Sequence, residues 1–453
     1  MFGKVKTMSA GSAVTKTVWQ YSEPLPEDTM EFLKGIAADY CKVKNYIYKR
    51  YSGVGSLDKL TPVYSILNEM RHCGLREQLN LPVVYYELAI ADAVTDIKAR
   101  WGTVKNKIGG LITENENLSA DDRRYLRTVL KLNSTYAAIL NRKEYEMPKN
   151  AEGLEIDVKH LNSLLCRLTR RYLTPPETDS ANLFRISPNG YSYKNGVLYI
   201  VCRVPRKRIP IPLKDSRTFD RQIQIHIKKD SVALAIPVET KVKKHEDYTN
   251  TVYVHIGYQD MFTLSDGTIY GKDLESKVTP ETERLANKNR ERHKIYTVYK
   301  QNTEDGNRKK AKSIETNNLG REKYDRQKEK ERNRTTAFIN SEINRMIRTE
   351  KPNKVVITRS VAVNRTKHFS KSANRKLTRS FNAYIRERLA YKCRINSIEL
   401  VEINSNGTGK ICSNCGAEGK RQGLEFYCES CGKKTTVPFN SAENIKKKYL
   451  NKG

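Results

Sequence analysis

Residues 412–432 read CSNCGAEGKRQGLEFYCESCG, and this stretch contains two Cys-x-x-Cys pairs separated by twelve residues. A gap of two residues lets a tight turn direct two thiolates at one ion. Two such turns complete a tetrahedral site of four sulfur ligands. The spacing therefore predicts a zinc ribbon that holds one structural Zn²⁺. The predicted ligands are Cys412, Cys415, Cys428 and Cys431.

Glycine directly follows each pair, as Gly416 and Gly432. A redox-active pair is expected instead at the N-terminus of a helix that follows a strand, so glycine-rich turns disfavour this alternative. The other five cysteines stand singly and are explained as small buried apolar residues. Clustering of the remaining four indicates a metal site rather than disulfides.

The chain carries a large excess of positive charge. Its 453 residues include 83 Lys and Arg against 51 Asp and Glu, a formal net charge of +32. A polyanionic partner relieves such self-repulsion through phosphate contacts and counterion release, which predicts binding of nucleic acid. A basic surface without a partner is the alternative.

Nothing in the sequence points to a membrane. No stretch approaches the ~20 apolar residues of a spanning helix, and no apolar signal segment is evident. We therefore expect a cytoplasmic, nucleoid-associated protein with no membrane partner.

Helical and strand-like patterns occupy different parts of the chain. Residues 26–150 show apolar residues at helical spacing, including predicted helices at 84–101 and 119–140. After a predicted helix at 157–172, short alternating runs broken by Pro and Gly predict a β-rich part. The predicted strands lie at 14–21, 196–203, 222–227, 232–237, 252–256, 355–357 and 395–403.

Two segments are candidates for nucleic-acid contact. Residues 281–334 hold 17 Lys and Arg against 10 Asp and Glu and predict solvated helices, for which a merely wet surface is an equal alternative. Residues 365–394 hold ten basic residues, one acid and four aromatic residues, which suits phosphate contact and stacking. Phe381, Ile385 and Leu389 are expected to form the core stripe of a helix, with its arginines on the opposite face. The candidate contacts are Arg365, Lys367, Lys371, Arg375, Lys376, Arg379 and Arg386.

Several short blocks beyond residue 250 recur in a known order. They are HIGY at 255–258, FTLSDG at 262–267, NLG at 318–320, KPNKVVI at 351–357, NRKL at 374–377, the cysteine pairs with GKR at 419–421 between them, and NSAENI at 440–445. This order resembles TnpB and the type V CRISPR effectors, a family of RNA-guided nucleases with an RNase H-like (RuvC-type) core. The resemblance is detailed over 250–450 and rests on architecture alone over the N-terminal half.

The resemblance implies a multidomain α+β fold with a helical recognition domain, a β-barrel-like wedge domain and a RuvC-like α/β domain into which the zinc ribbon is inserted. The implied ranges are 1–25 for the N-terminal part of the wedge domain, 26–150 for the recognition domain, 151–250 for the wedge domain, 251–406 for the RuvC-like domain, 407–435 for the ribbon and 436–453 for the C-terminal RuvC-like segment.

Three positions depart from the pattern of the family. In the family, acids at these positions hold two divalent ions that activate water and stabilise the leaving oxygen. This chain has His255, Thr358 and Pro438 there. Because Mg²⁺ prefers carboxylate oxygens and a proline side chain offers no ligand, the resemblance implies loss of catalytic Mg²⁺ and of nuclease activity.

Nearby acids leave an alternative open. If they served as ligands, the chain would be an active RuvC-type DNA nuclease with relocated metal ligands. These acids are Asp260, Asp266, Glu402 and Glu443.

The implied function is that of an RNA-guided, nuclease-inactive DNA-binding protein, similar to the nuclease-dead TnpB-like repressors. Its partners would be a guide RNA and a double-stranded target DNA with a short adjacent motif, and occupancy of the target would repress transcription. An active nuclease and an unguided RNA- or DNA-binding protein are the two alternatives.

Overall fold

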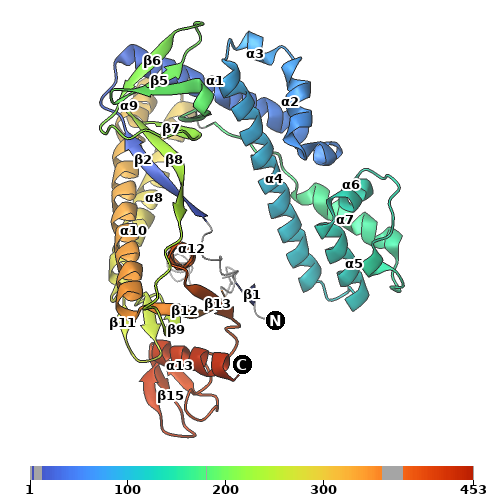
Figure 1. Ribbon diagram of the computed structural model, residues 1–453, viewed down its shortest axis with the longest axis vertical. Helices are drawn as coiled ribbons and strands as arrows, with labels where there is room; N and C mark the ends of the chain where they lie inside the picture. Colours follow the sequence, from blue (N-terminus) through green and yellow to red (C-terminus); the bar gives the residue numbers. More distant parts are fainter. Residues whose placement is uncertain (1–2, 5–12, 180, 360–380, 452–453) are drawn as a thin grey trace. The chain divides into compact units, whose positions relative to one another are not determined.

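The computed structural model describes residues 3–4, 13–179, 181–359 and 381–451 (Figure 1). Contacts within the chain divide it into two compact units, Thr15–Glu239 and Met1–Val14 with Thr240–Gly453. Each unit is described by itself. None of the described helices has an apolar stretch long enough to cross a membrane.

The Thr15–Glu239 unit begins with helices built on two long ones. Helices α1 and α4 pack along each other through buried residues such as Ile36, Tyr40 and Ile90. α4 extends well beyond the predicted 84–101, because Val104 and Ile108 continue its apolar stripe. The helices are α1 (Glu27–Tyr51), η1 (Val54–Leu60), α2 (Val63–Arg71), α3 (Leu75–Gln78), α4 (Val83–Glu114), α5 (Ala120–Lys131), α6 (Asn133–Leu140) and α7 (Val158–Tyr172), with short 3-10 turns at Lys149–Ala151 and Pro188–Gly190.

The helix predicted at 119–140 is two helices. Its start is a capping box, in which the Ser119 hydroxyl accepts from the Asp122 amide and the Asp122 carboxylate accepts from the Ser119 amide. Leu132 then leaves the helical conformation, with φ −92° and ψ 101°, and α6 begins at Asn133.

The strands of this unit form two sheets rather than one. A four-stranded sheet has the order β2-β8-β7-β3, and a three-stranded sheet has the order β4-β5-β6. The strand predicted at 196–203 therefore lies apart from those predicted at 222–227 and 232–237. Asn195 and Gly196 adopt positive φ values of 50° and 74° and close β4 and β5 into their own hairpin. The strands are β2 (Ala13–Tyr21), β3 (Leu183–Ile186), β4 (Tyr191–Lys194), β5 (Val197–Val201), β6 (Arg208–Pro212), β7 (Ile223–Ile227) and β8 (Val232–Lys241).

The other unit is organised around a six-stranded sheet with the order β1-β13-β12-β9-β10-β11. β9, β12 and β13 are parallel, whereas β1 pairs antiparallel with β13, β10 with β9, and β11 with β10. Because β1 pairs with β13, the predicted segment 1–25 contributes strands to both units. The strands are β1 (Gly3–Lys4), β9 (Asn250–Ile256), β10 (Phe262–Leu264), β11 (Ile269–Tyr270), β12 (Pro352–Thr358) and β13 (Glu399–Ile403).

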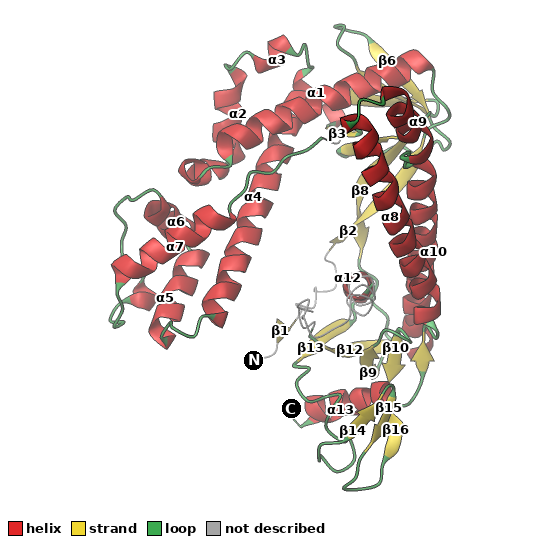
Figure 2. Cartoon of the chain, turned by 180° about the vertical axis from the view of Figure 1, so that it is seen from behind, coloured by secondary structure: helices red, strands yellow, loops and turns green. Residues whose placement is uncertain are grey.

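Helices cover both faces of this sheet (Figure 2). Val254 and Ile357 pack with residues of α8, α10 and α12, whereas Tyr253 and Val356 pack with Ile445 of α13. This alternation follows the two-residue period of a strand and explains the almost continuous apolar runs in β9 and β12. The helices are α8 (Leu274–Glu304), α9 (Arg308–Asn318), α10 (Glu322–Glu350), α12 (Asn382–Ile395) and α13 (Val437–Leu450).

Between β13 and α13 the chain forms a small antiparallel sheet of β14 (Lys420–Gln422), β15 (Glu425–Tyr427) and β16 (Lys434–Thr436). Phe426 is buried beneath the cysteine turns. Glycine is required at position 419, because a Cβ atom there would lie 2.2 Å from the Phe426 ring.

Candidate metal centre and the adjoining strand ends

The four predicted cysteines come together in the structure. Their sulfur atoms all lie within 4.8 Å of one another. The Sγ atoms are 3.6 Å apart for Cys412 and Cys431, and 3.5 Å apart for Cys415 and Cys428. Tetrahedral zinc with Zn–S bonds of about 2.3 Å separates its sulfur ligands by about 3.8 Å, so the four residues fit such an ion.

Two tight turns aim these thiols. The Gly416 amide donates to the Cys412 carbonyl at 3.0 Å, and the Gly432 amide donates to the Cys428 carbonyl at 2.8 Å. Both glycines have positive φ, 81° and 72°, which only glycine adopts without strain. A hydrogen bond from the Lys433 backbone lowers the pKa of the Cys431 thiol to about 6, whereas hydrogen bonding with the Cys428 thiol raises the pKa of Cys415 to about 11.

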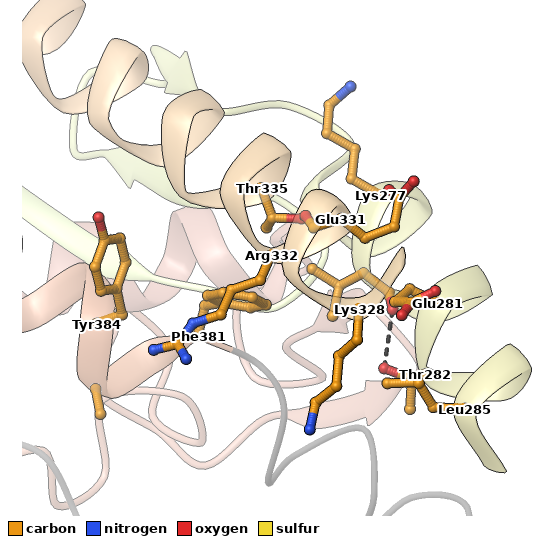
Figure 3. A pocket seen from close by; sticks show the side chains of 12 residues that line it. Lys277, Glu281, Thr282, Leu285, Lys328, Glu331, Arg332, Thr335, Phe381 and Tyr384 are labelled. Atoms are coloured by element: carbon orange, nitrogen blue, oxygen red, sulfur yellow. Dashed lines mark hydrogen bonds between the residues drawn. The ribbon is translucent and has the colours of Figure 1, made fainter. Parts of the chain in front are cut away.

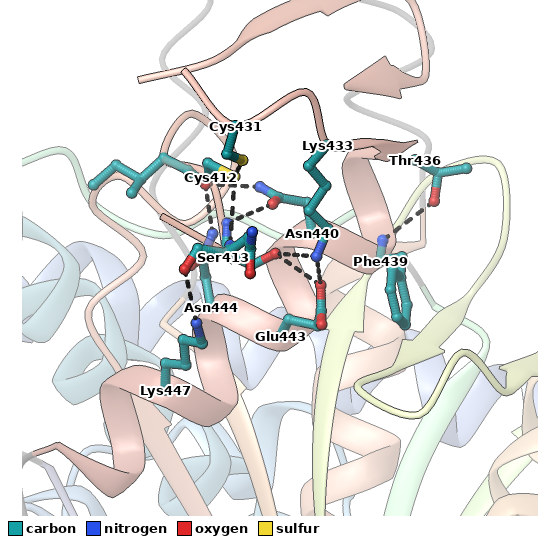
Figure 4. Close-up of polar contacts among 12 residues, drawn as sticks. Cys412, Ser413, Cys431, Lys433, Thr436, Phe439, Asn440, Glu443, Asn444 and Lys447 are labelled. Carbon is teal, nitrogen blue, oxygen red and sulfur yellow. Dashed lines mark hydrogen bonds and ion pairs between the residues drawn. The ribbon is translucent and has the colours of Figure 1, made fainter. Parts of the chain in front are cut away.

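A buried polar network joins this metal centre to α13 (Figure 4). The Asn440 side chain, fully buried, accepts from the Ser413 amide at 2.8 Å and donates to the Ile411 carbonyl at 2.8 Å. The side-chain amide of Asn444 also donates to the Ile411 carbonyl, at 2.7 Å. Lys433 and the Ser413 hydroxyl both donate to the Glu443 carboxylate, at 2.6 and 2.7 Å. The first cysteine turn is therefore held directly on the helix.

Strands β9 and β12 end side by side. Their register pairs Val254 with Ile357, and the next residues on the two strands are His255 and Thr358. On the other side of β12, Glu402 of β13 pairs with Ile357. Because parallel strands end at the same edge of a sheet, His255, Thr358 and Glu402 lie at one edge. Glu402 shares the face of Ile357 and α12, whereas His255 and Thr358 lie on the α13 face.

The guanidinium of Arg386, from α12, lies at the same edge. Its Nη1 donates to the Thr358 carbonyl oxygen at 2.6 Å and is 4.0 Å from a Glu402 carboxylate oxygen. Its Nε donates to the Asn382 side chain at 2.9 Å. Only 14% of the Arg386 side chain is exposed. We refer to His255, Thr358, Arg386 and Glu402 as the strand-end cluster.

The imidazole of this cluster is neutral at physiological pH. Burial lowers the pKa of His255 to about 4, and the charges of Arg386 and of Arg421, on β14, contribute to the lowering. The charges of Arg386 and Arg421 make the electrostatic potential at His255 more positive, which opposes binding of a further cation there.

Pro438 occupies the first turn of α13, where a missing backbone N–H leaves no hydrogen bond unmade. The helix is capped by the Thr436 hydroxyl, which accepts from the Phe439 amide (Figure 4). α13 packs against β9 and β12, so the third departing position lies on a helix that contacts the strands carrying the other two.

Each acid considered as a substitute metal ligand is engaged by another group. The partners are the Asp273 amide for Asp260, the Thr268 amide for Asp266, Arg386 for Glu402, and Lys433 with Ser413 for Glu443. Within the described ranges, the four cysteines are the only group of three or more His, Cys, Asp or Glu whose ligand atoms gather closely enough to hold an ion.

The predicted nucleic-acid contacts fall mostly outside the described residues. Arg365, Lys367, Lys371, Arg375, Lys376 and Arg379 all lie within 360–380. The expected core stripe is confirmed for Ile385 and Leu389, which are buried, and Phe381 packs against the same core. The expectation for α12 was wrong in two details. Phe381 precedes the helix with a positive φ of 54° instead of lying within it. Arg386 is directed at the end of β12 and is largely buried, rather than lying on an exposed opposite face.

A cavity that the sequence pattern did not indicate lies among α8, α10 and the start of α12 (Figure 3). Its volume is about 410 Å³. Val278 and Leu285 contribute apolar surface, whereas Lys328 and Arg332 add cations. The number of charged residues over 281–334 gives no sign of this cavity. Only their positions around the helices distinguish the residues that line it from those that face solvent.

No curated protein matches the sequence. A cryo-EM structure of the Cas12f1–sgRNA–target DNA complex is similar at 14% identity and a TM-score of 0.37, over 96% of this chain and 98% of that chain. The mini-RNA-guided endonuclease CRISPR-Cas_phi3 is similar at 12% identity and a TM-score of 0.48, over 96% of this chain and 92% of that chain.

A family model also matches the sequence, over the segment that contains α12, β13, the cysteine centre and the start of α13. The matching model is the Cas12f1-like TNB domain, and the matched residues are 383–445. Over residues 383–445 the chain is therefore similar to the Cas12f1-like TNB domain.

Proposed function

We propose that this chain is an RNA-guided DNA-binding protein that occupies its target without cutting it and thereby represses transcription. The observation that carries the proposal is the strand-end cluster. His255 and Thr358 stand where the family has metal-binding acids, and a guanidinium group is hydrogen-bonded to the end of β12, the strand that carries Thr358.

The charges at the strand ends support the proposal that the chain does not cut DNA. Two-metal hydrolysis needs carboxylates to offset the charge of two divalent ions. At this edge Glu402 is the carboxylate of the cluster, and Arg386 lies 4.0 Å from it. The neutral imidazole of His255 is a poor ligand for Mg²⁺. Asp260 already accepts a hydrogen bond from the Asp273 amide, and Glu443 accepts one from Lys433. These contacts disfavour the alternative in which the two acids are relocated metal ligands.

Binding, by contrast, is supported by the charge of the chain and by its family. A net charge of +32 supplies sequence-independent affinity for phosphates. Sequence would be read by base pairing with a guide RNA, with a short motif in the duplex read by the protein. Repression then follows from occupancy and needs no chemistry.

We further propose that the ion of the cysteine centre is zinc. Four thiolates with tetrahedral spacing favour this soft-tolerant ion and leave no open position for a substrate, so its role would be structural.

The proposal is tested with the protein purified together with its RNA. The bound RNA is sequenced, and DNA duplexes that match or scramble its 3′ segment are titrated in a gel-shift assay. Matched duplexes should bind at least tenfold more tightly and stay intact in Mg²⁺ or Mn²⁺. A matched site over a promoter should lower transcription.

Two outcomes would contradict the proposal in different ways. Equal affinity for matched and scrambled duplexes would favour an unguided nucleic-acid-binding protein. Metal-dependent cutting that is lost in Asp260→Asn or Glu443→Gln would favour a nuclease with relocated ligands.

A further inference from the structure

Strand β2 presents two large aromatic side chains to solvent. Trp19 is 42% exposed and Tyr21 is 52% exposed, whereas Gln20 between them is fully buried. Successive side chains of a strand point to opposite faces, so Trp19 and Tyr21 share the outer face of the β2-β8-β7-β3 sheet. Two exposed aromatic rings on one strand form a potential contact surface.

The Trp19 ring is held in place by the sheet beneath it. Its centroid lies 5.2 Å from that of His226, on β7, with an interplanar angle of 53°. Strand β8 separates β2 from β7, and there the residue paired with His226 is Ala233. Because alanine is small, the indole can reach across β8 to the imidazole. One part of the ring is therefore packed and another part faces solvent.

The backbone around the two rings is anchored as well. Arg217 Nη2 donates to the Trp19 carbonyl at 3.1 Å, and the Lys214 amide donates to the Tyr21 carbonyl at 2.9 Å. These contacts link β2 to the loop before β7. A ring fixed before binding loses little conformational freedom on contact with a partner.

The surroundings of the rings are basic. Lys214 and Arg217 are exposed in the adjoining loop. The nearby Asp215 is paired with Arg217, whose guanidinium holds the pKa of that carboxyl well below its usual range. An aromatic surface bordered by cations is complementary to a base with its flanking phosphates, because the base stacks and the phosphates meet the cations.

We propose that Trp19 is a stacking platform for an unpaired nucleobase of the bound RNA, with Arg217 and Lys214 facing its phosphates. This inference rests on the proposed binding of nucleic acid and names one site for it. Stacking on an indole accepts any base, so the platform contributes affinity and position rather than sequence recognition.

Fluorescence isolates this site, because the chain has only two tryptophans. Trp101 is 3% exposed in the helical core, whereas Trp19 is exposed. The probe is the co-purified RNA, removed in high salt and then added back. It should quench the tryptophan emission and protect it from acrylamide. In Trp19→Phe, the remaining emission from Trp101 should not respond to RNA.

The RNA affinity of two Trp19 variants distinguishes stacking on a base from packing against His226. Trp19→Leu keeps apolar bulk over His226 but has no aromatic face, so RNA binding should weaken about tenfold, equivalent to about 1.4 kcal/mol. Trp19→Phe should stay within about threefold of the unsubstituted chain. RNA binding by the two variants is compared under conditions in which thermal melting shows both to be folded.

The outcomes distinguish the two proposals. Unchanged emission at an RNA concentration that saturates a gel shift, or full affinity in Trp19→Leu, would overturn the platform and leave nucleic-acid binding intact. Failure of the unsubstituted chain to bind RNA at all would overturn the proposed function together with the platform.

Discussion

Arg386 Nη1 donates a hydrogen bond of 2.6 Å to the carbonyl oxygen of Thr358, the last residue of β12. The arginine comes from α12, 28 residues further along the chain. A helix is thereby attached to the carboxyl end of a central strand through a charged group. The same group lies 4.0 Å from Glu402, and its charge contributes, together with that of Arg421, to the lowered pKa of His255.

Removal of this guanidinium should destabilise the chain. Arg386→Ala loses the hydrogen bonds to Thr358 and Asn382, and bonds from charged donors contribute about 1.5 to 3 kcal/mol. We expect a loss of about 2 kcal/mol in the free energy of unfolding, measured in urea. Arg394→Ala, at an exposed position of the same helix, should change it by less than about 0.5 kcal/mol. Equal effects would mean that the hydrogen bonds at the strand end contribute no stability.

Acid should weaken the fold through His255. The unfolded chain protonates this imidazole near its ordinary pKa of 6.5, whereas the folded chain does so near a pKa of about 4. Between these values the unfolded state binds more protons, so stability falls as the pH drops from about 6.5 to 4. As the pH falls through this range, the melting temperature of His255→Asn should therefore rise relative to that of the unsubstituted chain. A constant difference between the two would show that the imidazole titrates normally.

Zinc loss should unfold the ribbon locally. Cys428→Ser removes one of four ligands, and the binding energy of a structural zinc is also folding energy. Metal analysis should find about one zinc per chain in the unsubstituted protein and far less in the variant. Amide exchange should rise across 405–435. Cys73→Ser, outside the cluster, should retain the metal. A folded, zinc-free protein would contradict the prediction.

Asn440 should be needed to hold the ribbon on α13. Asn440→Ala leaves the Ser413 amide and the Ile411 carbonyl without this buried partner. Unsatisfied buried groups cost about 1 to 3 kcal/mol each. After relaxation of the structure, we therefore expect the free energy of unfolding to fall by about 2 kcal/mol. Lys447→Ala, which removes an exposed contact of 3.5 Å to Asn414, is the matched control. Comparable losses in both variants would rule out a specific role for Asn440.

The basic segment within 365–394 should follow a nucleic-acid backbone. Reversal of Arg375, Lys376 and Arg379 to Glu should weaken binding to all sequences alike. If each contacts one phosphate, the slope of log affinity against log salt should fall by about 2 to 3. An unchanged slope would show that these residues are only solvated. Arg375, Lys376 and Arg379 lie outside the described ranges, so this prediction rests on sequence.

Several local features could be predicted because neighbouring residues alone decide them. The spacing of Cys412, Cys415, Cys428 and Cys431 already restricts where their sulfur atoms can lie, and the structure confirms the cluster. The capping box at Ser119 follows from two side chains three residues apart. The strands predicted at 232–237 and 252–256 follow from alternation and apolar runs, which are properties of the strand itself.

The associations between distant residues were decided by tertiary structure. Helical phase places Arg386 at the border of the buried stripe of Ile385 and Leu389, but only the sheet order puts the end of β12 in front of it. Likewise, Trp19 meets His226 because β8 pairs with both β2 and β7.

The sequence by itself determined the cysteine centre, most helices and strands, the positive charge, and the absence of acids at positions 255, 358 and 438. Only the tertiary structure decided that β5 joins a separate sheet, that Glu443 is held by Lys433, and that a guanidinium occupies the strand ends. The physical reason is that periodicity reports which face of an element is buried. Which elements then meet depends on strand order and on crossover connections, whose energies come from contacts between residues far apart in sequence.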